Sequence, residues 1–127
     1  VGDGLRILVV DDNVDAAQTL GMLLETAGHK VTVEHSAQGA LARAGEGRFD
    51  IILLDIGLPD MSGHELAGAL QQLPNCAGCA LVAVSGYGQE QDRRLSREAG
   101  FDAHLVKPVP PDLLADTIAR VANSARR

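Results

Sequence analysis

An unbroken apolar run, residues 51–54, leads directly into Asp55 and constrains the fold more than any other stretch of the chain. Four apolar residues without polar alternation are typical of a strand that is buried on both faces, as in the middle of a parallel sheet. Residues 56–63 then hold two glycines and a proline, which predict a loop. We therefore expect Asp55 at the carboxyl end of a central strand, where open α/β sheets bind their ligands.

Strand signals of this kind alternate with helical patterns along the whole chain. Strands are predicted at 5–10, 31–34, 51–54, 80–84 and 103–106, and each is followed by a helical pattern, the fourth being a polar helix that ends at Ala99. Such alternation predicts an α/β fold with a parallel sheet and helices on both faces. Right-handed crossovers leave few topologies. The flavodoxin-like (βα)5 doubly wound five-stranded sheet with strand order 2-1-3-4-5 fits best, because it places the first strand beside the third at the switch point.

The helical segments carry recognisable caps and apolar stripes. Asp12 or Asn13 can cap the first helix, and Gly28 suits its C-terminal end. Ser62 followed by Glu65 is a capping-box pattern that predicts the start of the third helix. The face of the first helix predicted to be buried consists of Ala16, Leu20, Leu23, Leu24 and Ala27.

Composition limits the classes of protein to which the chain can belong. Its 127 residues suffice for one domain, with a core at about 5–122 and loose ends at 1–4 and 123–127. Aromatic residues make up only 2% and the net charge is −6, which argues against direct contact with nucleic acid. No apolar run approaches the roughly 20 residues that span a bilayer, and no signal peptide is visible. We expect a cytoplasmic domain without membrane contact.

Chemically capable residues follow four of the five predicted strands. They are Asp11, Asp12, Asp55, Ser85 and Lys107. In a parallel sheet all of them lie on one rim, where three carboxylates repel one another and a hard cation such as Mg²⁺ relieves the repulsion. A lysine and a hydroxyl group can each donate a hydrogen bond to an oxygen of a transferring phosphoryl group. The set is suited to nucleophilic attack by a carboxylate on phosphorus, which gives an aspartyl-phosphate.

Four short motifs carry a resemblance to a known family. They read V-D-D at 10–12, L-L-D-I-G-L-P-D-M-S-G at 53–63, V-S-G-Y at 84–87 and V-K-P at 106–108. Together they resemble the receiver domain of response regulators in two-component signalling, and the resemblance extends over residues 5–121. Each motif alone is common, but four in order, each at a predicted strand end, are specific.

The resemblance implies a metal site and a phosphoacceptor. By this likeness Asp55 accepts the phosphoryl group, and Asp11 and Asp12 hold Mg²⁺, one directly and one largely through water. Asp55 and the backbone carbonyl of Gly57 complete the protein ligands of the metal. Gly57 also occupies a position that tunes the lifetime of the phosphoryl group in this family.

The resemblance also implies a switch beside the phosphoacceptor. Ser85 is the hydroxyl that moves to meet the phosphoryl group, and Lys107 contacts its oxygens. His104 stands where the family usually has Tyr or Phe, the ring that swings inward on activation. Pro108 is expected to follow a cis peptide bond. Tyr87 is expected to tune the phosphoryl lifetime together with Gly57.

The function predicted from these residues is a phosphoacceptor switch in a two-component phosphorelay. Its partners are a histidine kinase or histidine phosphotransfer domain, and a downstream protein or an attached output domain. Such a chain is no enzyme beyond catalysing its own phosphorylation and dephosphorylation. The sequences of residues 57–63 and 85–88 resemble the C-terminal receivers of hybrid sensor kinases, so a parent polypeptide could be a histidine kinase. Two alternatives remain: a degenerate receiver that binds partners without phosphorylation, and a phosphohydrolase with Asp11 as nucleophile. The latter prefers a D-x-D spacing, whereas residue 13 is Asn.

The remaining candidates for chemistry are two cysteines and two histidines. Cys76 and Cys79 lie before a strand rather than at a helix N-terminus, and no second pair accompanies them, so redox or zinc chemistry is not favoured. His29 and His35 lie beside predicted turns and are expected to be solvated.

Overall fold

The computed structural model of the chain describes residues 4–76, 78–85, 100–107 and 109–125. In chain order the elements are β1 (Arg6–Val10), α1 (Val14–Thr26), β2 (Lys30–Glu34), α2 (Ala37–Glu46), β3 (Ile51–Asp55), α3 (Gly63–Gln71), a 3-10 turn (Pro74–Cys76), β4 (Ala80–Ser85), β5 (Ala103–Val106) and α5 (Pro111–Ala125). The polar helix predicted to end at Ala99 lies outside the described residues. None of the described helices is long and apolar enough to cross a bilayer.

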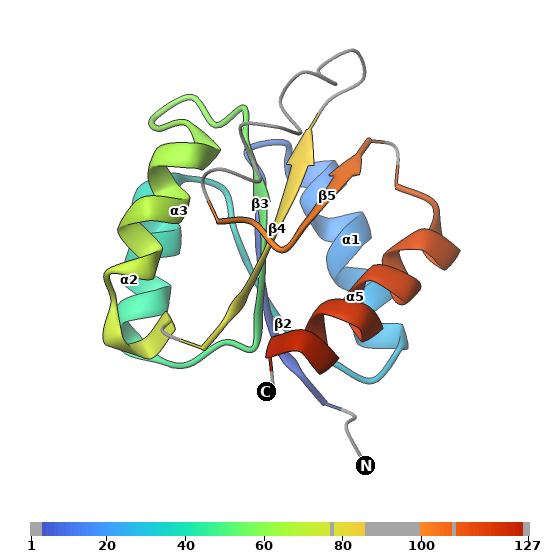
Figure 1. Cartoon of the computed structure of the whole chain (residues 1–127). Helices are drawn as coiled ribbons and strands as arrows, with labels where there is room; N and C mark the ends of the chain where they lie inside the picture. Colours follow the sequence, from blue (N-terminus) through green and yellow to red (C-terminus); the bar gives the residue numbers. More distant parts are fainter. Residues whose placement is uncertain (1–3, 77, 86–99, 108, 126–127) are drawn as a thin grey trace.

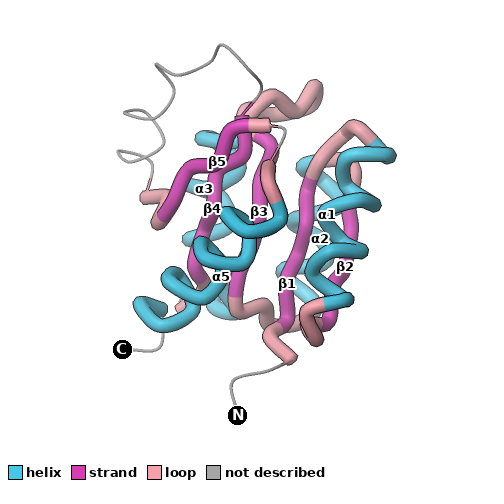
Figure 2. The backbone as a smooth tube through the Cα atoms, turned by 90° about the vertical axis from the view of Figure 1, so that its right-hand side faces the viewer, coloured by secondary structure: helices cyan, strands magenta, loops and turns pink. Residues whose placement is uncertain are grey.

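The five strands form one parallel sheet in the order β2-β1-β3-β4-β5. The predicted flavodoxin-like sheet with strand order 2-1-3-4-5 is therefore confirmed. Helices α2 and α3 cover one face of the sheet, and α1 and α5 cover the other (Figure 1). The view turned by 90° shows α5 and α1 in front of the strands, with α2 and α3 behind them (Figure 2).

Strand β3 shows why the central apolar run has no polar alternation. All five of its residues are buried. Ile52 and Leu54 belong to the core between the sheet and α2 and α3, whereas Ile51 and Leu53 belong to the core on the face of α1 and α5. Because successive side chains of a strand point to opposite faces, a strand covered on both sides needs an apolar residue at every position.

Helix α1 buries only part of its predicted face: Leu20 and Leu24 are buried, and Leu23 is half-buried against the core. Ala27 is exposed at the C-terminal end of the helix, and Ala16 is only half-buried. A Cβ atom at Gly21 would lie 3.3 Å from a methyl group of Val33, so glycine allows a close approach of the helix to β2. The buried stripe therefore also includes Ala17 and Gly21. The residues that α1 buries are Ala17, Leu20, Gly21 and Leu24.

The predicted caps are confirmed at two helix starts, and a third helix carries a serine cap as well. The side chain of Asn13 accepts a hydrogen bond from the Ala16 N–H at 3.1 Å, so Asn13 rather than Asp12 caps α1. Ser62 Oγ accepts from the Glu65 N–H and donates to the Glu65 carboxylate, each at 3.2 Å. Ser36 likewise caps α2. These caps fix where α1, α2 and α3 begin, directly behind the carboxyl ends of the strands.

A buried hydroxyl in α5 leads to a prediction about stability. Thr117 is fully buried, and its Oγ1 finds no hydrogen-bond partner among the described residues. We expect Thr117→Val, which keeps the branched shape, to raise the free energy of unfolding by about 1 kcal/mol, because an unsatisfied buried hydroxyl costs roughly 1–3 kcal/mol. Urea denaturation measures the change. Thr26→Val is the matched control, since that exposed hydroxyl donates to Met22 O and its loss gains nothing. A destabilised Thr117→Val would contradict the prediction.

Candidate functional site

Three carboxylates meet at the carboxyl edge of the sheet. Asp11 follows β1 and Asp55 ends β3, the neighbouring parallel strand, so both lie at the same edge. One carboxylate oxygen from each of Asp11, Asp12 and Asp55 lies within 4.8 Å of the others. Asp11 and Asp55 are 2% and 7% exposed, while Asp12 is exposed. The structure thus brings together the three acidic residues selected from the sequence.

The Asp11 carboxylate is only partly satisfied by protein groups. Its Oδ1 accepts a hydrogen bond of 2.9 Å from the Asn13 N–H. Its buried Oδ2 lies 2.7 Å from Lys107 Nζ as an ion pair, but no aligned hydrogen bond reaches this oxygen from the described residues. Burial and the charge of Asp55 raise the pKa of Asp11, against the lowering effect of Lys107 and the Asn13 N–H. Among the described residues, Asp11 and Asp55 therefore share a single ammonium group, that of Lys107.

Lys107 joins two of the carboxylates. Besides the contact with Asp11, its ammonium group donates a hydrogen bond of 3.3 Å to Asp55 Oδ2. Burial alone would lower the pKa of Lys107, but the contacts with Asp11 and Asp55 outweigh it and raise that pKa. Lys107 therefore stays charged at neutral pH. The contact of Lys107 with Asp11 is shorter than its contact with Asp55.

The loop after β3 holds the second oxygen of Asp55. The Gly57 N–H donates to Asp55 Oδ1 at 2.9 Å, and the Gly63 N–H donates to Ile56 O at 3.1 Å. The two oxygens of Asp55 therefore face different partners, a backbone amide and an ammonium group. The carbonyl of Gly57 stays a prediction as a metal ligand.

Ser85 and His104 contact each other on neighbouring strands. A hydrogen bond of 2.7 Å joins Ser85 Oγ and His104 Nε2. Ser85 ends β4 and is fully buried. In the β4–β5 register Ser85 pairs with Val106, two residues beyond His104, so Ser85 and His104 are diagonal neighbours on one face of the sheet. Sequence reasoning chose both residues but missed their contact, which only the register could have indicated.

The other predicted site residues fall into two groups. Tyr87 and Pro108 lie outside the described residues, and their roles stay predictions. Cys76 and Cys79 are free thiols. Burial raises the pKa of both, that of Cys79 to about 12. A reactive or metal-binding cysteine needs the opposite shift.

Two residues without a predicted role in the site form hydrogen bonds around it, one with Asp11 and one with α2. His35 is exposed as expected, but its Nδ1–H donates to the backbone carbonyl of Asp11 at 3.0 Å. Asp60, in the loop between β3 and α3, accepts hydrogen bonds from the first N–H groups of α2. His29, also expected to be solvated, is half-buried with a buried Nδ1.

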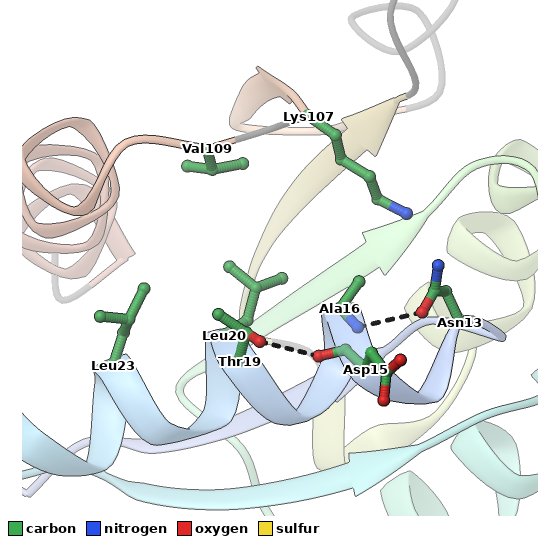
Figure 3. Close-up of a pocket in the computed structure, with 8 residues that line it drawn as sticks. All are labelled: Asn13, Asp15, Ala16, Thr19, Leu20, Leu23, Lys107 and Val109. Atoms are coloured by element: carbon green, nitrogen blue, oxygen red, sulfur yellow. Dashed lines mark hydrogen bonds between the residues drawn. The ribbon is translucent and has the colours of Figure 1, made fainter.

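A pocket of about 590 Å³ opens beside the acidic site, between α1 and the chain that leads from β5 to α5 (Figure 3). Lys107 reaches across its rim toward the N-terminal end of α1, where Asn13 lies. Ala16, Leu20 and Leu23, which belong to the predicted buried stripe of α1, line this pocket. The half-buried side chains of Ala16 and Leu23 give the pocket an apolar strip next to the site.

The donor set of the site fits Mg²⁺. Carboxylate oxygens are the hard ligands that this ion prefers, and it commonly uses one or two of them together with phosphate oxygens and water. Asp11 Oδ2 is buried and forms an ion pair of 2.7 Å with Lys107 but no aligned hydrogen bond with the described residues, so it can still accept a metal ligand bond. Asp12 is exposed and can reach the ion through water. Burial, and to a lesser extent the charge of Asp55, raises the pKa of Asp11, and a divalent ion would favour the charged carboxylate.

Comparison with known proteins places the chain in a family. A family model described as the response regulator receiver domain matches residues 7–119. A solved structure, a CheY-like response regulator receiver domain protein from Methanospirillum hungatei, has a TM-score of 0.89 and 32% identity, and the match covers 98% of each chain.

Two curated relatives differ greatly in length. An uncharacterized 14.6 kDa protein from the sodA1 3' region of Leptolyngbya boryana is 36% identical over 107 residues, which cover 84% of this chain and 82% of that protein. The sensor histidine kinase AtsR of Burkholderia thailandensis is 32% identical over 118 residues, which cover 92% of this chain but only 20% of the kinase. The site geometry and these matches agree, and the chain belongs to the response regulator receiver domain family of two-component systems.

Proposed function

We propose that the chain is a phosphoacceptor switch in which Asp55 receives a phosphoryl group from a histidine kinase or a histidine phosphotransfer domain. The proposed switch is a single domain of residues 5–122. The observation that carries the proposal is the position of Asp55, which shares an ammonium group with Asp11 and lies within 4.8 Å of two further carboxylates. Receiver domains are signalling domains rather than classical enzymes, so a stable or slowly lost adduct is the expected product.

The transfer needs one bond formed and one broken. A carboxylate oxygen of Asp55 attacks phosphorus, the bond from phosphorus to the donor nitrogen or oxygen breaks, and the leaving group takes up a proton. Mg²⁺ held by Asp11, Asp12 and Asp55 would neutralise charge on the phosphoryl oxygens. Lys107 supplies the protein's own positive charge within reach of Asp55. Such charges act where negative charge spreads over the transferring group.

The added phosphoryl group gives the switch its driving force. It brings a charge of about −1.5 to −2 beside Asp55. The proposed switch takes the Ser85 hydroxyl as the donor to His104 Nε2, so that it can donate to a phosphoryl oxygen only by giving up this hydrogen bond. The end of β4 and the start of β5 are thereby coupled to phosphorylation, and the surface that they support changes its affinity for a partner.

Removing the hydrogen-bonding nitrogen of His104 tests this coupling. We expect His104→Phe, which keeps a ring of similar size, to raise the fraction phosphorylated at a fixed subsaturating donor concentration by about 2- to 10-fold. The reason is that one net hydrogen bond, worth about 0.5–1.5 kcal/mol, no longer holds Ser85 away from the phosphoryl group. The steady-state fraction is read by intact mass.

Ser85→Ala is the partner variant for this experiment. It should lower the phosphorylated fraction, and His104→Phe should have no further effect in that background, because the two residues act through one hydrogen bond. Equal effects of His104→Phe in both backgrounds would show that the ring acts independently of Ser85.

The proposed function itself is tested with the unmodified protein. After incubation with acetyl phosphate and Mg²⁺, intact mass should show a single phosphoryl adduct that hydroxylamine removes and EDTA prevents. Absence of the adduct together with absence of Mg²⁺ binding would favour the degenerate binding module. Multiple turnover of a phosphomonoester that Asp11→Asn abolishes and Asp55→Asn preserves would favour the phosphohydrolase.

A further inference from the structure

We propose that Asp60 is a positioning residue for the acidic site, because it anchors the loop that follows Asp55 to the first turn of α2. The inference rests on the proposed function, since it concerns how the carboxylates are held for Mg²⁺ and phosphoryl transfer. Asp60 itself is not one of the three clustered carboxylates. Its role would be to fix the place of Asp55 relative to Asp11.

The contact between Asp60 and α2 uses both carboxylate oxygens. Oδ1 and Oδ2 each lie 3.1 Å from the Ala37 N–H, and Oδ2 lies 3.3 Å from the Gln38 N–H. Ser36 Oγ accepts a hydrogen bond of 3.0 Å from the N–H of the residue after Gln38, Gly39. The free N–H groups at the start of α2 are thus divided between the helix's own cap and a carboxylate more than twenty residues away. These hydrogen bonds, first that from Ala37, lower the pKa of Asp60, so it is charged at neutral pH.

The corner between β2 and α2 is bound to Asp11 on its other side. The Asp11 N–H donates to Glu34 O at 3.0 Å, and the Asp11 carbonyl accepts from His35 Nδ1–H at 3.0 Å. Glu34 and His35 therefore hold the Asp11 backbone at one end of this corner. The N–H groups of Ala37 and Gln38 hold the Asp60 carboxylate at its other end, without the Ser36 side chain. The loop that follows Asp55 and the loop that holds Asp11 are joined through this corner.

Such a connection matters because the two loops carry like charges. Asp11 and Asp55 repel each other, and among the described residues only Lys107 forms an ion pair with them. Mg²⁺ demands near-ideal octahedral geometry, so the spacing of its carboxylate ligands must be held against this repulsion. Residues that orient metal ligands from outside typically change metal affinity by about 10- to 100-fold. Asp60 acts through the loop backbone, so we expect an effect at or below the lower end of this range.

Two matched variants test the proposal, since each removes one side chain that accepts hydrogen bonds from the first N–H groups of α2. Asp60→Ala should weaken Mg²⁺ binding by about 3- to 10-fold, measured by calorimetry, and slow adduct formation from acetyl phosphate at a fixed Mg²⁺ concentration below saturation. Asp60→Asn, which keeps an acceptor oxygen, should recover part of both. Ser36→Ala removes the other cap of α2 without touching the Asp55 loop. It should shift the urea midpoint by an amount similar to Asp60→Ala, yet leave Mg²⁺ affinity unchanged.

The outcomes separate this inference from the proposed function. If Asp60→Ala and Ser36→Ala change Mg²⁺ affinity equally, or if Asp60→Ala lowers stability alone, Asp60 is only a helix cap and the inference is overturned. In that case wild-type protein still binds Mg²⁺ and forms the adduct, so the proposed function stands. If the wild type neither binds Mg²⁺ nor forms the adduct, both are overturned together.

Discussion

Asp55→Asn removes the phosphoryl adduct completely in the acetyl phosphate experiment, because a neutral amide oxygen cannot attack phosphorus as a carboxylate does. The fold should persist. The amide has almost the same shape, and its oxygen can still accept the hydrogen bond that the Gly57 N–H gives to Asp55 Oδ1. Lys107 keeps its contact of 2.7 Å with Asp11. Intact mass over a time course measures the loss, and far-ultraviolet circular dichroism checks the fold.

Asp112→Asn is the control for this experiment. It makes the same chemical change at an exposed acidic residue in the first turn of α5, and it should be phosphorylated like the wild type. A stoichiometric, hydroxylamine-sensitive adduct on Asp55→Asn would show that another carboxylate is the acceptor. An adduct that resists hydroxylamine would instead indicate a hydroxyl group such as that of Ser85.

The sheet and the positions of the acidic residues could be predicted because both depend on local patterns. The apolar run before Asp55 defines a strand buried on both faces, and parallel strands necessarily bring their carboxyl ends to one edge. Asp11, Asp55 and Lys107 are predictable as site residues because each directly follows a predicted strand. The caps at Asn13 and Ser62 were equally local, since they depend on residues three positions apart.

Contacts that depend on register or on the path of a loop were not predictable. The hydrogen bond between Ser85 and His104 requires the exact pairing of β4 with β5. The anchoring of Asp60 on α2 depends on how the loop between β3 and α3 folds back over the sheet edge. The burial of Gly21 in α1 depends on its close approach to Val33, across a distance that no helical pattern encodes. In each case the deciding interaction joins segments whose separation the sequence does not specify.

Two glycines of α3 should respond to the same substitution in opposite directions. A Cβ atom at Gly63 would lie 2.5 Å from Ile56 Cα and 2.7 Å from its Cγ2. Neither glycine is among the described residues with positive φ, so the requirement at Gly63 is steric. Gly63→Ala forces the helix start away from the backbone beside Asp55. We expect it to lower the free energy of unfolding by about 1–3 kcal/mol, as overpacking of a tight site does.

Gly68→Ala is the matched control, because a Cβ atom at this exposed position of the same helix meets nothing within 4 Å. There alanine should raise the free energy of unfolding by about 0.5–1 kcal/mol, through its higher helix propensity. Urea denaturation of both variants measures the two signs, and calorimetry with Mg²⁺ measures the effect on the site. Only Gly63→Ala should weaken Mg²⁺ binding, because only Gly63 touches the residue that joins Asp55 to Gly57. Equal stabilisation by both substitutions would mean that the loop yields freely, and the close contact of Gly63 with Ile56 would then have no part in holding Asp55.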